Sequence, residues 1–113
     1  MDCLFCKIAN KQISSNIVYE DDEIAAFTDV SPKAPVHILI IPKKHIPTVL
    51  DLTVEDCALI GRLYMIANKI ATDKKIDKSG FRLVMNCNRD AGQSVFHIHL
   101  HMLGGRVMSW PPG

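Results

Sequence analysis

The chain has 113 residues, which is enough for one domain but too short for a second independent core. Hydrophobic residues make up 48% and charged residues 22%, as is ordinary for a globular protein, and the formal net charge is +1. This charge forms no basic stripe, which argues against nucleic acid as a partner, and no apolar run reaches the ~18 residues that a membrane span needs. We therefore expect a single domain over residues 1–113 that binds neither nucleic acid nor a membrane.

The first half of the chain is predicted to form one short helix and three strands, over residues 3–10, 17–20, 24–28 and 36–41. A polar turn joins the first two strands, and a loop with two prolines precedes the third. The third strand is almost continuously apolar, which is typical of a central strand buried on both faces.

The second half is dominated by one long helix over residues 53–72, which opens with a capping box formed by Thr53 and Asp56. Its apolar face is predicted from residues that recur at helical spacing: Ile60, Leu63, Tyr64, Ala67, Ile70 and Ala71. Two further strands are predicted over 81–87 and 95–103, with a loop at 88–92 between them. The sum is an α+β fold with a five-stranded antiparallel sheet, one long helix and one short helix, and a meander is the default strand order.

The cysteines indicate the compartment. Residues 1–7 contain no long apolar stretch, so we expect no secretory signal. Four cysteines without such a signal predict reduced thiols rather than a disulfide framework. The sequence therefore predicts a protein of the cytoplasm, with the nucleus as the alternative. Cys57 and Cys87 are expected to be small buried hydrophobic residues.

Three of the five histidines, His97, His99 and His101, alternate with apolar residues on the last predicted strand. Because successive side chains of a strand point to opposite faces, one face carries three imidazoles. The other face carries the apolar groups Phe96, Ile98, Leu100 and Met102, which can pack on a helix. Imidazoles at this spacing fit either a metal site or nucleophilic catalysis by a central histidine.

The residues before this strand favour catalysis on a phosphate group. Gly92 permits close approach of the backbone, and Ser94 offers a hydroxyl and an N–H group. Gln93 lies between them, and Asn86 adds an amide from the neighbouring strand. Together these residues predict a phosphate pocket that contains a nucleophile, rather than a closed metal cage.

The sequence resembles the histidine-triad family along nearly its whole length, most of all the histidine-triad nucleotide-binding branch. The resemblance is carried in order by segments at 27–32, 34–37, 41–46, 92–95, 97–103 and 104–106 and by the ending Trp110-Pro111-Pro112-Gly113. It implies a homodimer whose two sheets join into one ten-stranded sheet. It also implies hydrolysis of adenosine or guanosine 5′-phosphoramidates, and of related acyl- and sulfo-adenylates, through a covalent nucleotidyl-histidine. Three alternatives remain: a dinucleoside polyphosphate hydrolase, a nucleotide-binding interaction module with incidental catalysis, and a purely metal-binding domain.

The resemblance also implies roles for the histidines. His99 is the nucleophile that attacks the α-phosphorus, oriented by the backbone carbonyl of His97. His101 donates to a phosphate oxygen, His37 supports the constellation, and Ser94 lies near the leaving group. The chemistry itself requires no metal.

The same resemblance implies the nucleotide contacts. Asn86, Gly92, Gln93 and Ser94 hold the phosphate together with His99 and His101. Asp29 binds the ribose hydroxyls, and Val30 with nearby apolar side chains encloses the purine base. Trp110 is expected to reach the active site of the other subunit.

A second motif is the C-x-x-C pair of Cys3 and Cys6, which is half of a zinc site. Some histidine-triad proteins bind structural zinc with two cysteines and two histidines, and the matching histidines here are His45 and His97. The resemblance thus implies a structural zinc ion held by Cys3, Cys6, His45 and His97. Free buried thiols and a redox pair are the alternatives, although the thioredoxin-like context of a redox pair is absent.

Overall fold

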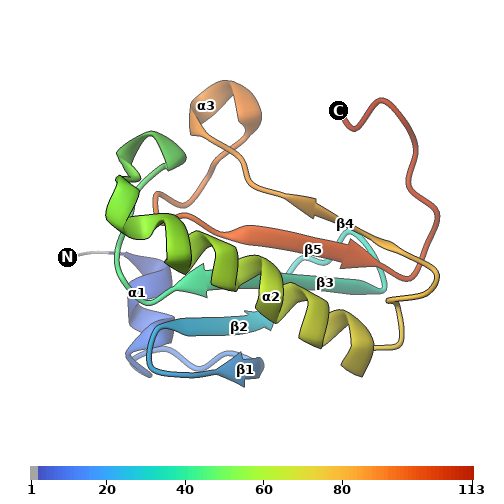
Figure 1. Cartoon of the computed structure of the whole chain (residues 1–113), viewed down its shortest axis with the longest axis horizontal. Coiled ribbons are helices and arrows are strands. Elements are labelled where there is room, and N and C mark those ends of the chain that lie inside the picture. Colours follow the sequence, from blue (N-terminus) through green and yellow to red (C-terminus); the bar gives the residue numbers. More distant parts are fainter. Residues whose placement is uncertain (1–2) are drawn as a thin grey trace.

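The computed structural model describes residues 3–113, so the first two residues of the predicted domain lie outside the described part of the chain. The described part forms one five-stranded sheet, with a long helix crossing one face and a short helix on the other (Figure 1). The helices are α1 (Leu4–Ala9), α2 (Cys57–Asp73) and α3 (Asn88–Ala91), with 3-10 turns η1 (Val49–Asp51) and η2 (Val54–Asp56) before α2. The strands are β1 (Ile17–Glu20), β2 (Ile24–Thr28), β3 (Val36–Pro42), β4 (Phe81–Val84) and β5 (Leu100–Gly104).

The strand order is β1-β2-β3-β5-β4, and all four neighbouring pairs are antiparallel. The prediction of a five-stranded antiparallel sheet is confirmed, but the default meander order is wrong. The long helix carries the chain from β3 past one strand position to β4, and β5 then returns between them. As a result β3 lies at the centre of the sheet and β4 lies at an edge.

The two faces of the sheet bury two separate apolar clusters. On one face, α2 packs Leu63, Ile66, Ala67 and Ile70 against alternate residues of β2, β3 and β5. On the opposite face, α1 packs against Ala25, Phe27, Leu39 and Ile41. The continuously apolar strand is therefore buried on both faces, as predicted.

The long helix begins where the sequence indicates. Thr53 and Asp56 form the predicted capping box at η2, and α2 follows directly. Burial of Leu63, Ala67, Ile70 and Ala71 confirms most of the predicted apolar face, but Tyr64 is 45% exposed. Tyr64 and its neighbour Met65 lie on the side of α2 that faces away from the sheet.

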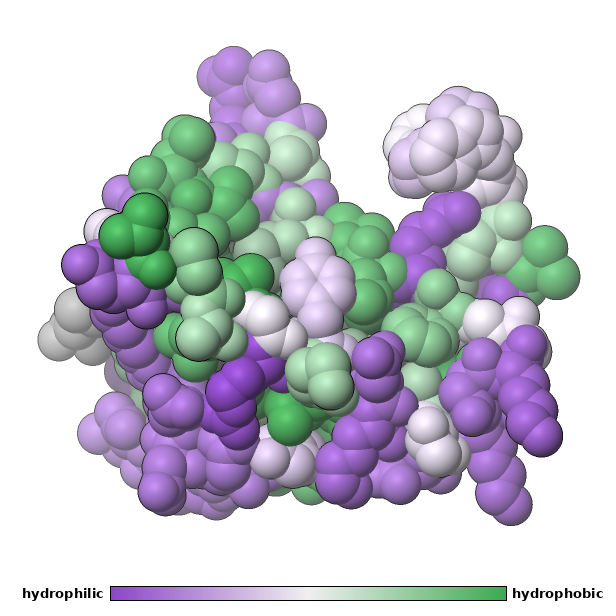
Figure 2. Space-filling model, viewed as in Figure 1, coloured by the Kyte–Doolittle hydropathy of each residue, from purple (hydrophilic) through white to green (hydrophobic). Residues whose placement is uncertain are grey.

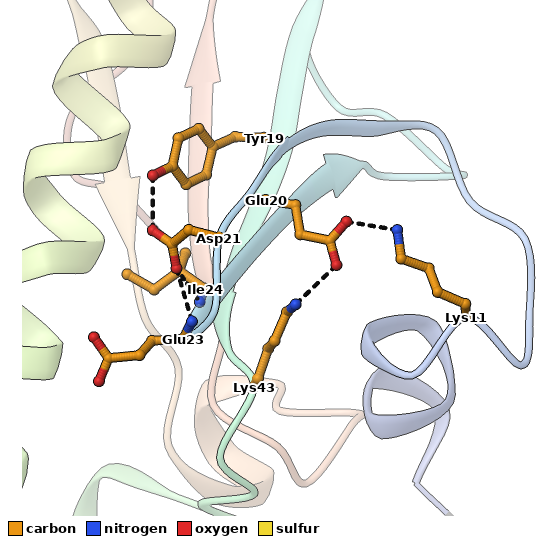
Figure 3. Close-up of polar contacts among 7 residues, drawn as sticks. All are labelled: Lys11, Tyr19, Glu20, Asp21, Glu23, Ile24 and Lys43. Carbon is orange, nitrogen blue, oxygen red and sulfur yellow. Dashed lines mark hydrogen bonds and ion pairs between the residues drawn. The ribbon is translucent and has the colours of Figure 1, made fainter.

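The turn between β1 and β2 is held by a carboxylate (Figure 3). Asp21 accepts hydrogen bonds from the Tyr19 hydroxyl and from the backbone N–H groups of Glu23 and Ile24, and it pairs with Arg62 of α2 at 2.6 Å. Although burial opposes it, these hydrogen bonds hold the pKa of Asp21 well below its usual range. The predicted polar turn thus also ties the hairpin to α2.

Charged side chains tie the same hairpin to both of its flanks (Figure 3). Glu20 of β1 accepts from Lys11, which follows α1, and from Lys43, which follows β3. Lys44 likewise pairs with Asp56 at 2.7 Å. The two lysines after β3 therefore make ion pairs within the chain.

Several expectations about the second half of the chain are wrong. The last strand begins at Leu100 rather than at Val95. The backbone N–H of Ile98 bonds to the carbonyl of Ile46 instead of to β3. Pro42, which ends β3, has no N–H group with which to extend the ladder. Phe96 is consequently 49% exposed instead of packed on the helix.

The others concern the loop at 88–92, the strand before it, and Cys57 and Cys87. Residues 88–91 form the short helix α3, and Gly92 ends it with a φ of 86°. The predicted strand 81–87 is shortened to β4. Cys57 is exposed and Cys87 is half-buried, so neither is a core residue. Within residues 3–113, no helix is long and apolar enough to cross a membrane.

Candidate active site

A cavity of about 500 Å³ opens on the α1 face of the sheet, beside the histidines. Its apolar wall comes from α1, the loop after it, β2, β3 and the loop before β5, through Leu4, Phe5, Ile8, Ile13, Phe27, Leu39 and Val95. Its polar wall holds Asp29, Asn86, Ser94, His99 and His101, with Gly92 beside them. Val30 stands at the rim, where it is 98% exposed. The cavity therefore joins an apolar pocket to a row of polar groups.

His99 stands between the two walls. Its Nδ1 donates to the backbone carbonyl of His97 at 2.8 Å, and the edge of its ring meets Phe5 at 5.0 Å between centroids. Burial lowers the pKa of His99, although the bond to that carbonyl opposes the shift. Because Nδ1 carries the proton, Nε2 keeps a free lone pair. This is the state that a nucleophilic imidazole needs.

Two further histidines form a relay whose proton positions follow from its hydrogen bonds. The backbone N–H of Lys33 donates to His37 Nδ1 at 3.0 Å, so the proton of the neutral ring lies on Nε2. That Nε2 lies 2.9 Å from His101 Nδ1, which must therefore accept. His101 is left with its proton on Nε2. The chain of bonds thus makes His101 a donor beside His99, whose ring centroid is 4.9 Å away.

The environment keeps these rings neutral. Burial, aided by His99 and His37, lowers the pKa of His101 to about 4. Burial also lowers the pKa of His37, although the carboxylate of Asp29, 3.5 Å from its Nε2, opposes the shift. At neutral pH the site therefore presents one free lone pair and one N–H donor without adding positive charge.

The loop before β5 places Ser94 at the cavity. Neither the hydroxyl nor the backbone N–H of Ser94 is engaged in a hydrogen bond within residues 3–113. Gln93 is different, because its side chain accepts from Asn88 N–H and donates to the carbonyls of Pro47 and Val95. The side chain of Gln93 thus holds the loop, whereas the sequence had suggested that it holds a phosphate group.

Sequence reasoning missed the contribution of α1 to the cavity. The sequence predicts a short helix there and no role for Leu4, Phe5 and Ile8, although their spacing puts them on one side of that helix. Trp110, by contrast, lies outside the cavity of its own chain. Its ring is 81% exposed and stands over the Arg82 guanidinium, 5.9 Å from the ring centroid.

The second predicted site is assembled beside the first. Sγ of Cys3 and of Cys6 lie 3.4 and 3.5 Å from His97 Nδ1, and Cys6 Sγ lies 3.3 Å from His45 Nδ1. The two Nδ1 atoms are 3.2 Å apart. His97 Nε2 bonds to the carbonyl of Pro42 at 2.7 Å, so it carries the proton and Nδ1 offers a lone pair. The four predicted ligand atoms therefore converge, all within 4.8 Å of one another.

These distances match the edges of a zinc tetrahedron. With Zn–S of about 2.3 Å and Zn–N of about 2.05 Å, the edges are about 3.3 Å between nitrogens and about 3.6 Å between nitrogen and sulfur. Asp29, His37 and His101 also approach one another, but two of their atoms already share a proton. The cluster of Cys3, Cys6, His45 and His97, and not the group of Asp29, His37 and His101, therefore has the donor set of a closed metal site.

Comparisons with known proteins identify the family of this chain. The family described as "Scavenger mRNA decapping enzyme C-term binding" matches residues 2–110. The purine nucleoside phosphoramidase of Escherichia coli K12 is 51% identical over 95% of this chain and 90% of its own length. The crystal structure of a HIT family hydrolase from Legionella pneumophila has a TM-score of 0.98 at 51% identity, covering 99% of this chain and 100% of that one. The chain belongs to the histidine-triad (HIT) family.

A third relative agrees with this assignment. A histidine-triad protein from Clostridium difficile has a TM-score of 0.94 at 46% identity, covering 96% of this chain and 95% of its own. The predicted family is therefore confirmed, and so is the HIT-like α+β fold with one long helix. In the HIT chain described here, His99 and His101 of the triad lie at the polar wall of the cavity, while the ring of His97 is buried beside the thiols.

We expect the melting temperature to fall as the pH is lowered from about 7 to about 5. In the unfolded chain a histidine titrates near pH 6.5, whereas folding lowers the pKa of His101 to about 4. Between these values the unfolded state binds more protons, so stability is lost as the pH falls through this window. Thermal melts of the wild type and of His101→Gln test this. The variant should lose less stability over the same range, and equal losses would contradict the assignment.

Proposed function

We propose that this chain is a purine nucleoside phosphoramidase that acts as one catalytic domain. The hydrogen-bonded histidine row carries the proposal, because it leaves a nucleophilic Nε2 on His99 beside the N–H donor of His101. The relative from Escherichia coli, which bears that name and is 51% identical, supports the substrate class.

The reaction proceeds in two steps. His99 Nε2 attacks the α-phosphorus, the P–N bond breaks, and the amine leaves after taking up one proton from solvent. Water then attacks the nucleotidyl-histidine. Hydrolysis releases nucleoside 5′-monophosphate and one proton and regenerates neutral His99. Splitting the displacement in this way lets one nucleophile serve many leaving groups.

The polar wall stabilises the negative charge on the non-bridging phosphate oxygens. His101 donates Nε2–H to a non-bridging oxygen, and the free N–H and hydroxyl of Ser94 face the same cavity. A preorganised donor of this kind is worth about 3–4 kcal/mol of barrier. Asn86 adds an amide, and Gly92 with Gln93 shapes the loop that carries Ser94.

The apolar wall takes the nucleoside. Phe5, Ile8 and Phe27 face the base, and Val30 closes the rim. Asp29 lies at the junction of the apolar and polar walls, where its carboxylate accepts from the ribose hydroxyls. One of its oxygens is already fixed by the backbone N–H of Ser31 at 2.8 Å, which orients the other.

We further propose that Cys3, Cys6, His45 and His97 hold a structural zinc ion. The donor set and its edge lengths support this, and a closed four-ligand site leaves no position for substrate. Zinc would supply stability to the N-terminal helix and take no part in catalysis. A site that needs free thiols suits a reducing compartment such as the cytoplasm.

The sheet edge supports a homodimer. β4 is an edge strand, and such edges are normally covered in native proteins. Figure 2 shows apolar groups exposed over the near face of α2, and Tyr64 and Met65 are 45% and 66% exposed. Pairing of two β4 edges, flanked by α2, gives a ten-stranded sheet. The tail that carries the exposed Trp110 would then reach the partner.

His99→Ala should abolish turnover of adenosine 5′-phosphoramidate, by at least about 10⁴-fold, because the nucleophile is lost. Binding of AMP should stay within about threefold of the wild type, since both walls of the cavity remain. Calorimetry with AMP and a turnover assay measure the two effects, and a diadenosine polyphosphate serves as the comparison substrate. Near wild-type turnover by the variant would refute the mechanism, while faster turnover of the diadenosine substrate would reassign the substrate class.

Protein purified without chelator should contain about one zinc ion per chain. Cys3→Ser, Cys6→Ser and His97→Ala should each lower zinc content and melting temperature, because binding energy at a structural site contributes to folding. His99→Ala is the matched control, two residues away on the same row, and should keep its zinc. Elemental analysis and thermal melts decide the matter. A metal-free wild type, or zinc loss in His99→Ala, would overturn the proposed ligand set.

Sedimentation at micromolar concentration should find a dimer. Met65→Glu should shift it toward monomer, since it adds a charge to the exposed side of α2 without touching the core. Trp110→Ala should remain dimeric but change the ratio of kcat/KM between phosphoramidates with different amines. A monomeric wild type would refute the assembly, whereas unchanged selectivity in Trp110→Ala would refute only the reach of the tail.

A further inference from the structure

We propose that Cys3 and Cys6 are positioning residues for the nucleoside, so that metal at their cluster and nucleotide in the cavity bind cooperatively. This rests on the proposed function, which supplies the nucleotide and the zinc. The coupling would link the cluster of Cys3, Cys6, His45 and His97 to the cavity beside His99.

The coupling starts from the shared helix α1. Cys3 is its N-cap, and Sγ of Cys3 accepts from the backbone N–H of Cys6 at 3.3 Å. Leu4 and Phe5 lie between the two thiols in sequence, and Ile8 follows one turn later. These three side chains line the cavity, while the two thiols point into the cluster. One short helix thus carries both metal ligands and cavity wall.

The helix depends on external contacts for its position. It has only six residues, far fewer than an isolated helix needs for stability in water. Phe5, Ile8 and Ala9 pack on the sheet, and the thiols of Cys3 and Cys6 add only weak hydrogen bonds to His45 and His97. Metal ligation would replace those contacts with two metal–thiolate bonds, which would link the start of α1 to His45 after β3 and to His97 before β5. Without the metal, the end of the helix that carries Leu4 and Phe5 would be held only by the packing of Phe5 and by the weak thiol contacts.

The catalytic histidine is held more independently. His99 Nδ1 bonds to a backbone carbonyl of His97, and that residue remains fixed through its own Nε2 bond to Pro42. Phe5 is the contact that metal loss should disturb, because its ring makes T-shaped contacts with both His99 and His97, at 5.0 and 6.0 Å between centroids. Metal loss should thus weaken nucleoside binding more than it slows the chemical step.

The experiment measures this split in the intact chain. AMP affinity, KM and kcat for adenosine 5′-phosphoramidate are compared in zinc-loaded protein, in protein stripped with chelator under reducing conditions, and in the Cys3→Ser, Cys6→Ser double variant. We expect the AMP dissociation constant and KM to rise about tenfold without metal, with kcat changed less than about threefold. Saturating AMP should tighten zinc binding by the same factor, because linkage between two sites is reciprocal.

Two controls separate positioning from general loss of stability. Leu63 lies on the buried side of α2, on the opposite face of the sheet from α1. Leu63→Ala should lower the melting temperature by leaving a cavity there, while the AMP affinity stays within about twofold of the wild type. Ile8→Ala weakens AMP binding through the wall itself and should keep full zinc content while reducing the effect of AMP on zinc affinity.

Each outcome has one meaning. Equal AMP affinity with and without zinc, or weakening in Leu63→Ala as large as that in stripped protein, overturns the coupling and leaves the phosphoramidase and zinc proposals standing. A wild type that binds AMP and turns over substrate but takes up no zinc overturns the coupling together with the metal site. A zinc-loaded wild type that neither binds AMP nor turns over substrate overturns the proposed function itself.

Discussion

The hydrogen bond from His99 Nδ1 to the carbonyl of His97 is the interaction on which the rest of the site depends. It fixes the tautomer of a buried ring and so decides which nitrogen can react. The bond needs His97 to be immobile. That is achieved by the ring of the same residue, which is completely buried, bonds to Pro42 and faces two thiols. His97 therefore orients His99 through its backbone, and its side chain contacts the two thiols at the start of α1.

Burial gives the histidine row its second property, which is neutrality. Four neighbouring imidazoles could not all carry a proton so close together, and desolvation lowers the pKa of His37, His97, His99 and His101 alike. Nucleophilic attack needs a free lone pair, and donation needs an N–H, and both are available only in neutral rings. The site obtains these from the hydrogen-bond order, which begins at the backbone N–H of Lys33 and ends at His101. The cost appears as stability that is lost when the medium becomes acidic.

Local pattern predicted the elements well where a side chain's neighbours in sequence are also its neighbours in space. Both strands of the first hairpin begin and end as predicted, because alternation and a polar turn are local signals. The last strand was predicted too long, since nothing local shows that Pro42 leaves the facing ladder without a donor. Exposed Cys57 and Tyr64 likewise depend on how α2 is rotated on the sheet. The four cysteine and histidine residues that the resemblance implies for a metal site do converge in the structure, and the roles of the other histidines stay predictions. The cavity wall on α1 and the inward-bonded Gln93 emerge only from the tertiary arrangement.

The sheet and the helix divide the positioning of the site between them. His37 and His101 lie on β3 and β5, which are paired at the centre of the sheet, so the relay rests on rigid strands. His99 lies just before β5, outside that ladder, and its ring is placed instead by the His97 carbonyl and by Phe5 of a six-residue helix. Phe5 in turn lies, with Leu4, between two cysteines whose thiols converge on His45 and His97. A chain of this size has little core to spare for holding such a helix. With metal bound as proposed, a cross-link at its N-terminus would keep the apolar wall of the cavity and His99 in a fixed relation.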